Sequence, residues 1–300
     1  MDIWHVQLAR NGQAASFVTI YTTLEKGGLM ETGPVTQYDF TVMRNEPVAQ
    51  GIWRLVITSE VARTIEPGQF MNLRVPGDGA HILRIPLSFK RADAKAETVE
   101  LLYAVVGEGT ERLAKMRAGD TSTLVGPCGR GWWLPKAEGR ALLVAGGIGL
   151  PPIFAAARQL AEAGVGFDVV VGNHTAERHL MQEIDELRCL SAGEVCDCER
   201  RVVVCTDDGT LGLDGFTTDG MAQLLAERTY AEVYTCGPTV MMAGIAKLAR
   251  EHGIACQASM ERMMGCGFGA CSCCNVALVA GGYALCCQDG PVFDAEEVAW

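Results

Sequence analysis

The periodicity of the apolar residues changes once along the chain, near Ala141, and this change constrains the fold more than any other feature. From Tyr38 to about Pro135, short runs of alternating apolar residues are separated by turns rich in Gly and Pro. Closely spaced strands of this kind predict an antiparallel barrel or sandwich. After Ala141, apolar strands alternate with stretches of helical periodicity, which predicts a parallel sheet covered by helices. The expected fold class is therefore a multidomain β plus α/β protein.

The length and composition of the chain support this division. Its 300 residues are enough for two or three domains, and 49% apolar against 20% charged residues allow a large core. We expect an N-terminal extension of unknown role over residues 1–36, the antiparallel β-barrel over 37–137, the parallel α/β domain over 138–252, and a cysteine-rich domain over 253–300.

The acidic balance of the chain argues against nucleic-acid binding. The net charge is −11 and the pI is about 5.0, whereas proteins that bind nucleic acids neutralise phosphates with basic residues. The longest uncharged apolar stretch, 141–157, has 17 residues and contains paired Gly and Pro, so we expect no membrane span. The N-terminus lacks the apolar core of a signal peptide. We therefore expect a cytoplasmic protein whose thirteen cysteines are not paired in disulfides.

Seven of the thirteen cysteines lie in the last fifty residues, and their spacing points to a metal cluster. The pattern C-x4-C-x2-C, followed a dozen residues later by an adjacent pair, comprises Cys266, Cys271, Cys274 and the pair Cys286-Cys287. Plant-type ferredoxins use this spacing for a [2Fe–2S] cluster, and interleaved glycines let the backbone wrap the cluster closely. A zinc ribbon is the alternative, although adjacent cysteines make a poor tetrahedral chelate. Because Cys273 also adjoins Cys274, the ligand within each adjacent pair stays open.

Two glycine motifs predict a nucleotide site at the carboxyl edge of the parallel sheet. Gly146-Gly147-Ile148-Gly149 stands where the first strand of the α/β unit turns into its helix, so backbone N–H groups and the helix dipole can meet a pyrophosphate. Cys236-Gly237-Pro238 follows the last strand of this βα series. Because ligands of open parallel sheets bind beyond the strand carboxyl ends, both motifs should face one crevice. We interpret this crevice as a site for a nicotinamide dinucleotide. A tight turn is the alternative for the first motif alone.

Together these features resemble one family, the electron-transfer subunits of class 1B dihydroorotate dehydrogenases within the ferredoxin–NADP reductase superfamily. The resemblance covers about residues 37–295, and its most specific stretches are Cys266-Gly267-Phe268-Gly269-Ala270-Cys271 with Cys274, and Cys287-Gln288-Asp289-Gly290-Pro291-Val292-Phe293. In this family the fourth ligand directly precedes the x-Asp-Gly-Pro-Val-Phe run, which implies Cys287 rather than Cys286. The resemblance further implies FAD, a [2Fe–2S] cluster and NAD as cofactors. It implies an FMN-containing dihydroorotate dehydrogenase catalytic subunit as partner, in a heterotetramer of two plus two.

The resemblance also implies where FAD would bind. The family pattern of Arg-Pro-Ile-Ser on a strand, then Leu-Tyr-Arg, then a Gly-Thr pair, corresponds here to Ile85-Pro86-Leu87-Ser88, Leu102-Tyr103-Ala104 and Gly109-Thr110. Both arginines of the pattern are replaced. Arg84 lies one residue early, and on a strand this shift turns a side chain to the opposite face unless a bulge intervenes. The charge beside the FAD pyrophosphate is expected from Arg84, or else from Arg112 or Lys115.

The three cofactors favour electron transfer between a two-electron and a one-electron carrier. A nicotinamide exchanges a hydride, an iron–sulfur cluster takes single electrons, and a flavin between them can do both. The resemblance implies a flow from dihydroorotate, oxidised at the partner's FMN, through the cluster and FAD to NAD+, within pyrimidine biosynthesis. We expect Cys236 to position the nicotinamide rather than to react, beside a flavin ring whose edge is bound by Ser88.

Two other functions stay open on the sequence. The same fold suits an NAD(P)H:ferredoxin-type or bifurcating oxidoreductase subunit with a different redox partner. The replacement of both flavin arginines also fits a non-enzymatic scaffold that binds zinc and has lost FAD.

Two histidines and the apolar C-terminal segment are expected at the surface. His174 and His179 are expected at the surface, in a loop and a helix that follow a strand of the parallel sheet. The apolar tail with Val292, Phe293 and Trp300 is expected to form part of the face that docks the partner.

Overall fold

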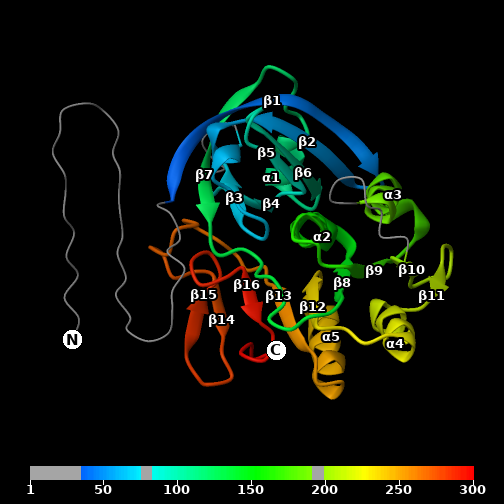
Figure 1. The fold of residues 1–300 in the computed structure, drawn as a ribbon. Coiled ribbons are helices and arrows are strands. Elements are labelled where there is room, and N and C mark those ends of the chain that lie inside the picture. Colours follow the sequence, from blue (N-terminus) through cyan, green and yellow to red (C-terminus); the bar gives the residue numbers. More distant parts are fainter. Residues whose placement is uncertain (1–34, 76–82, 191–198) are drawn as a thin grey trace.

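The computed structural model describes residues 35–75, 83–190 and 199–300. The predicted N-terminal extension therefore lies almost wholly outside the described residues. Two seven-stranded sheets form the body of the described chain, and a separate two-stranded hairpin lies beside them (Figure 1).

The first sheet is antiparallel throughout and confirms the expected β unit. Its order is β4-β3-β7-β1-β2-β6-β5, so β4 and β5 are edge strands that do not pair with each other. The predicted barrel is thus a curled half-barrel, and register shifts between β1 and β2 mark irregularities that help such a sheet to bend. Its elements are β1 (Thr36–Ala49), β2 (Ile52–Thr58), η1 (Glu60–Arg63), β3 (Phe70–Leu73), β4 (Ile85–Ser88), β5 (Arg91–Asp93), β6 (Thr98–Ala104), α1 (Glu108–Leu113) and β7 (Thr121–Cys128).

The second sheet is parallel apart from its last strand pair, as the βα periodicity predicts. Its order is β11-β10-β9-β8-β12-β13-β16. Its elements are β8 (Ala141–Gly146), η2 (Gly147–Gly149), α2 (Leu150–Glu162), β9 (Phe167–Asn173), η3 (Ala176–Arg178), α3 (Met181–Cys189), β10 (Val202–Thr206), β11 (Leu213–Asp214), α4 (Thr217–Glu227), β12 (Glu232–Cys236), α5 (Thr239–Glu251), β13 (Ala255–Ser259) and β16 (Val292–Asp294).

Helices cover both faces of the second sheet, which explains why its central strands are apolar at nearly every position. Every residue of β8 and β9 is buried. Leu142 and Val144 pack in one core with residues of α4 and α5, whereas Leu143 packs in another core with residues of α2 and α3. Side-chain alternation along β8 therefore serves two hydrophobic layers.

The cysteine-rich segment leaves the second sheet and then returns to it. It departs after β13, forms the hairpin of β14 (Asn275–Ala277) and β15 (Tyr283–Leu285), and closes the sheet edge with β16, antiparallel to β13. Val292 and Phe293 of β16 are only 2% and 5% exposed. The expectation that these two residues form a docking face is therefore wrong, because their side chains pack from the edge strand β16 into the hydrophobic core.

Buried charges join the two sheets. Lys90, which lies between β4 and β5, is 1% exposed, and its Nζ lies 3.2 Å from Glu183 Oε1 of α3 and 3.3 Å from Glu100 Oε1 of β6. Arg54 of β2 forms ion pairs with the same two carboxylates. Two cations from the half-barrel thus enclose the carboxylate of Glu183, which is itself 1% exposed.

Lys90 also contacts a second carboxylate of α3 and an aromatic ring of α2. Lys90 Nζ lies 3.0 Å from Glu186 Oε2 and 4.7 Å from the centre of the Phe154 ring on α2. Desolvation raises the pKa of Glu186, but hydrogen bonding and charge from Lys90 outweigh this effect, so the pKa lies below its usual value. The network therefore fixes α2 and α3 against the half-barrel, provided that the carboxylates are ionised.

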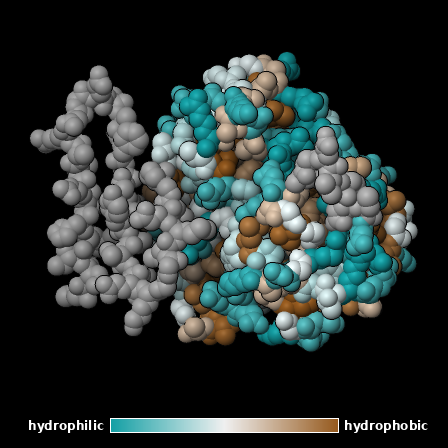
Figure 2. Space-filling view, viewed as in Figure 1, coloured by the Kyte–Doolittle hydropathy of each residue, from teal (hydrophilic) through white to brown (hydrophobic). Residues whose placement is uncertain are grey.

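No helix within the described ranges is long and apolar enough to cross a membrane. The face of the molecule in Figure 2 is largely hydrophilic, with smaller apolar patches between the polar regions.

We predict that Lys90→Met lowers the free energy of unfolding by roughly 3–5 kcal/mol, because it leaves buried carboxylates without one of their cations. Arg188→Ala is the control, since Arg188 pairs with Asp185 through exposed side chains and such pairs contribute only about 0–1 kcal/mol. Denaturant unfolding at pH 7 measures both variants. Equal losses in the two variants would contradict the structural role of the network.

Candidate functional site

A large cavity of about 1480 Å³ lies between the two sheets. Ordinary pockets for small ligands measure roughly 300–1,000 Å³, so this cavity has room for more than one such molecule. Its walls come from β4, β6 and α1 on one side and from the carboxyl ends of β8 and β12 on the other.

The half-barrel wall contains every residue that the family resemblance assigns to FAD. The cavity is lined by Arg84, Ile85, Pro86, Leu87, Ser88, Leu102, Tyr103, Ala104, Gly109 and Thr110. The Thr110 hydroxyl accepts hydrogen bonds from the N–H groups of Val106 and Gly107 and donates one to the Gly107 carbonyl. This hydroxyl therefore shapes the loop that enters α1.

Arg84 lines the cavity, but its guanidinium is held by the half-barrel. It donates hydrogen bonds of 3.0 Å to the carbonyl oxygen of Thr123 and to Oε1 of Gln37. Burial, followed by the nearby charge of Arg74, lowers its pKa from the ordinary value. Of the three cations expected to replace the missing arginines, Arg84 lines the cavity and Arg112 and Lys115 do not.

The opposite wall carries the two glycine motifs, which meet as expected for a crevice beyond the strand ends. Gly146, Gly147, Ile148, Gly149, Cys236, Gly237 and Pro238 all line the cavity. A Cβ atom on Gly149 would lie 2.2 Å from the carbonyl oxygen of Cys236, so this glycine is required for the close approach of the two motifs. Gly147 has φ +55°, a backbone conformation that favours glycine, and a Cβ at this position would meet only Asn173 Oδ1, at 3.8 Å.

Cys236 is poised as a neutral thiol. Burial raises its pKa to about 12, and the side chain of Ser259 forms a hydrogen bond with it. Ser259 lies directly opposite Cys236 in the β12–β13 register and also lines the cavity. A neutral thiol at physiological pH fits a residue that positions a ligand better than one that attacks it.

Several cavity residues lie outside the set that the sequence assigned to FAD or NAD. The segment Ser259–Met264 and the group of His174, Arg178 and Asp207 all line the cavity. The His174 imidazole lies 2.5 Å from the Asp207 carboxylate. Only the register of β12 with β13 and of β9 with β10 brings these residues to the crevice, and the sequence gives no direct signal of it.

The expectation that His179 lies at the surface is wrong. It is 3% exposed rather than at the surface, and its Nε2 lies 3.0 Å from the Cys205 carbonyl. Burial lowers its pKa, so the imidazole is neutral at pH 7. His174 is exposed, as expected.

The four thiols expected to bind the cluster lie in two pairs. The Cys266 and Cys271 side chains are within hydrogen-bonding reach of each other, as are those of Cys274 and Cys287. Hydrogen bonds from the backbone N–H groups of Cys266 and then Cys273 lower the pKa of Cys271 to about 7. No three His, Cys, Asp or Glu side chains among the described residues converge on the position of a single metal ion.

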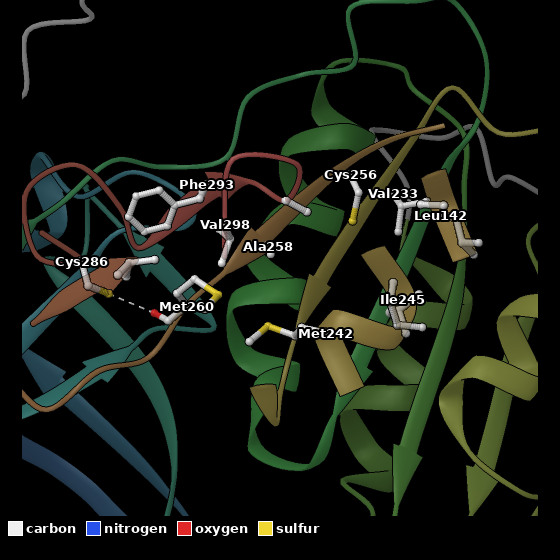
Figure 3. Close-up of a cluster of buried hydrophobic side chains, with 14 of the residues drawn as sticks. Leu142, Val233, Met242, Ile245, Cys256, Ala258, Met260, Cys286, Phe293 and Val298 are labelled. Carbon is white, nitrogen blue, oxygen red and sulfur yellow. Dashed lines mark hydrogen bonds between the residues drawn. The ribbon is translucent and has the colours of Figure 1, made fainter. Parts of the chain in front are cut away.

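The structure separates the adjacent cysteines Cys286 and Cys287. The Cys287 Sγ accepts a hydrogen bond from the N–H of Gly269 at 3.2 Å, within the cysteine loop. The Cys286 Sγ points the other way, into the hydrophobic core, and donates to the Met260 carbonyl at 3.2 Å (Figure 3). This geometry supports Cys287 as the ligand.

The loop backbone suits a sulfur-rich group. N–H groups of Phe268 and Gly269 donate to the sulfurs of Cys266 and Cys287. Gly269 has φ +85°, and a Cβ at this position would lie 2.5 Å from Gln288 Oε1. Two pairs of thiols, with backbone donors aimed at all four sulfurs, fit the two irons of a [2Fe–2S] cluster.

Comparisons with known proteins agree with this geometry. Residues 261–299 match the family described as the iron-sulfur cluster binding domain of dihydroorotate dehydrogenase B, and residues 143–247 match the oxidoreductase NAD-binding domain. The dihydroorotate dehydrogenase B (NAD(+)) electron transfer subunit of Geobacillus sp. (strain WCH70) is 36% identical over 269 residues, which cover 87% of this chain and 98% of the relative. The subunit of the same name from Fusobacterium nucleatum is 34% identical over 267 residues, 87% of this chain and 97% of the relative.

The chain belongs to the family of dihydroorotate dehydrogenase B electron transfer subunits. Its fold is also similar to that of a solved NADH-dependent reduced ferredoxin–NADP oxidoreductase, a protein of flavin-based electron bifurcation. That protein is 29% identical, with a TM-score of 0.74 over 87% of this chain and 89% of its own. A ferredoxin reductase of carbazole 1,9a-dioxygenase, 19% identical with a TM-score of 0.61 over 75% of this chain and 68% of its own, shows the same fold.

These matches confirm the cofactor predictions of FAD, a [2Fe–2S] cluster and NAD. They favour the iron–sulfur interpretation of the cysteine motif over a zinc ribbon, because residues 261–299 match an iron–sulfur domain.

We predict that Cys287→Ser abolishes most of the bound iron and sulfide, whereas Cys286→Ser retains both. The reason is that the Cys287 sulfur lies in the cysteine loop and the Cys286 sulfur lies in the core. Iron and sulfide analysis of anaerobically purified protein, with the visible spectrum, measures the difference. Loss of iron from Cys286→Ser with retention in Cys287→Ser would reverse the assignment.

We predict that Cys236 of the native protein reacts with iodoacetamide at pH 8 at least about tenfold more slowly than the exposed Cys189, because the raised pKa leaves little of this half-buried thiol ionised. Peptide mass spectrometry over a time course measures both sites. Denatured protein is the control, in which both sites should react at similar rates. Equal rates in the native protein would show that Cys236 is more acidic than its surroundings indicate.

Proposed function

We propose that this chain is the electron transfer subunit of a dihydroorotate dehydrogenase. In this proposal it passes electrons between the FMN of a catalytic partner and NAD+, through a [2Fe–2S] cluster and FAD. The proposal rests most directly on one observation: the segment Ser259–Met264 lines the nucleotide cavity and runs directly into Cys266 of the cysteine loop.

This continuity supports an electron path because one short segment joins the wall of the nucleotide cavity to the cysteine loop. Met260 and Met264 are 3% and 7% exposed and pack in the same core as Cys274 and Cys287. FAD supplies the exchange between a two-electron hydride and single electrons when it is bound. The chain itself contributes orientation and exclusion of water, which hydride transfer requires from a protein.

The two cavity walls would bind different cofactors. The half-barrel wall, from Arg84 to Ser88 and with Gly109-Thr110, would hold FAD. The wall with Gly146–Gly149 and Cys236-Gly237-Pro238 would hold NAD, with Cys236 beside the nicotinamide. We propose that the functional divisions are the N-terminal extension at 1–36, the FAD domain at 37–137, the NAD domain at 138–252 and the cluster domain at 253–300. The second sheet nevertheless continues into the cluster domain through β13 and β16.

The partner would dock near the cysteine loop. Large apolar side chains are exposed on this part of the chain, namely Met263 at 79%, Phe268 at 38%, Val279 at 68% and Tyr283 at 73%. Exposed apolar groups of this kind mark interaction surfaces when they gather on one region. We propose an FMN-containing dihydroorotate dehydrogenase catalytic subunit as partner, in a heterotetramer of two plus two located in the cytoplasm.

A second candidate function is a subunit of an NAD(P)H:ferredoxin-type or bifurcating oxidoreductase. The similarity to the bifurcating ferredoxin–NADP oxidoreductase, 29% identical with a TM-score of 0.74, supports this alternative. The two functions share the cavity and the cysteine loop and differ in the protein that exchanges electrons with the cluster.

Mixing the purified chain with the FMN-containing catalytic subunit should produce NAD+ reduction that depends on dihydroorotate, whereas neither protein alone should show it. Cys287→Ser should abolish this coupled reaction and retain NADH-dependent reduction of a dye, since the flavin wall is intact. Absorbance at 340 nm and dye bleaching measure the two reactions. Coupling to reduced ferredoxin with no response to dihydroorotate would favour the second candidate function.

A further inference from the structure

Asn72 is a buried polar residue whose side-chain amide has no partner within the described chain. It lies on β3, is 1% exposed, and neither Oδ1 nor Nδ2 forms a hydrogen bond with any described residue. Burying an amide without a partner costs free energy. A residue of this kind in a packed core therefore points to a partner that is not part of the polypeptide.

The Asn72 amide is directed at the cysteine loop. A Cβ atom on Gly267 would lie 1.7 Å from Asn72 Nδ2, 3.0 Å from its Cγ and 3.6 Å from its Cβ. The order of these distances shows that the nitrogen is the atom nearest to the loop. Gly267 has φ +83° and directly follows Cys266. Only glycine leaves the space that lets the amide approach the backbone here.

The same side of β3 also lies near the Cys266 sulfur. Cys128 lies opposite Phe70 in the β3–β7 register, where Asn72 lies opposite Val125. Burial, and in smaller part the charge of Cys266, raises the pKa of the Cys128 thiol. Asn72 lies opposite Pro86 in the β3–β4 register. The residue therefore stands between the strand of the proposed flavin wall and the first cysteine of the cluster motif.

We propose that Asn72 is a positioning residue of the cluster, whose Nδ2 donates a hydrogen bond to the sulfur shell at Cys266 and thereby raises the reduction potential of the cluster. This inference rests on the proposed function, because it requires the [2Fe–2S] cluster to be present. It adds a side-chain donor from the half-barrel to the backbone donors of the loop itself.

The direction of the effect follows from charge. Reduction adds one electron to the cluster, and hydrogen bonds to its sulfurs stabilise the more negative state. Removal of the donor therefore shifts the potential to more negative values. A side chain that merely fills space would change stability without this shift.

The test compares three variants of the full-length protein, purified anaerobically with its cluster. Asn72→Leu removes the donor at similar volume, and Asn72→Asp keeps the shape but replaces the donor with an acceptor. Asn45→Leu is the control, since Asn45 lies on β1 and its amide is satisfied by Leu113, Met116 and Tyr103. Redox titration followed by electron paramagnetic resonance of the reduced cluster gives the potential of each protein.

We expect both Asn72 variants to retain iron and sulfide and to show a more negative cluster potential, with an altered resonance spectrum. Asn45→Leu should lose stability and keep the potential of the unaltered protein. An unchanged potential in an Asn72 variant that holds the cluster overturns the inference. Loss of iron from both variants also overturns it, because the amide would then be needed to build the site rather than to tune it.

Failure of the proposed function itself gives a different result. In that case the unaltered protein holds its cluster but shows no NAD+ reduction that depends on dihydroorotate, and the cluster potentials of the Asn72 variants still decide the Asn72 inference.

Discussion

The buried charges around Glu183 hold the whole site in place. Lys90 and Arg54 come from the half-barrel, and the carboxylate comes from α3 of the second sheet's helix layer. Removing ions from water is costly, so such a cluster is stable only when every charge keeps its partners. The relative placement of the two sheets, and hence the width of the cavity between them, depends on this mutual requirement. Ion pairs, as well as hydrophobic packing, therefore hold the walls of the cavity in position.

The cavity and the cysteine loop are also linked through sequence-adjacent residues. Ser259 contacts Cys236 in the cavity, and seven residues later Cys266 opens the cluster motif. This short covalent spacing limits how far the cluster loop can lie from the cavity wall. Asn72 would add a contact from the opposite sheet, so that the cluster loop is held from both sides.

The sequence was informative wherever function depends on local spacing. The glycine motifs, the cysteine pattern and the βα alternation each predict a structure from neighbouring residues, and all of the residues assigned to FAD or NAD line one cavity. It was uninformative wherever function depends on pairing between distant strands. The contact of Lys90 with Glu183 spans 93 positions, and Ser259 reaches Cys236 only through strand register. The burial of Val292 and Phe293 was misread because a three-residue strand has too little pattern to reveal its partner.

The position of β16 has a consequence for how the protein matures. This strand covers the edge of the second sheet, yet it follows all four cluster cysteines in the chain and ends only six residues before the C-terminus. An uncovered strand edge invites pairing with other chains. The edge of β13 therefore stays exposed until the cysteine segment between β13 and β16 has folded back. Folding of the cysteine segment thereby also covers the edge strand of the second sheet.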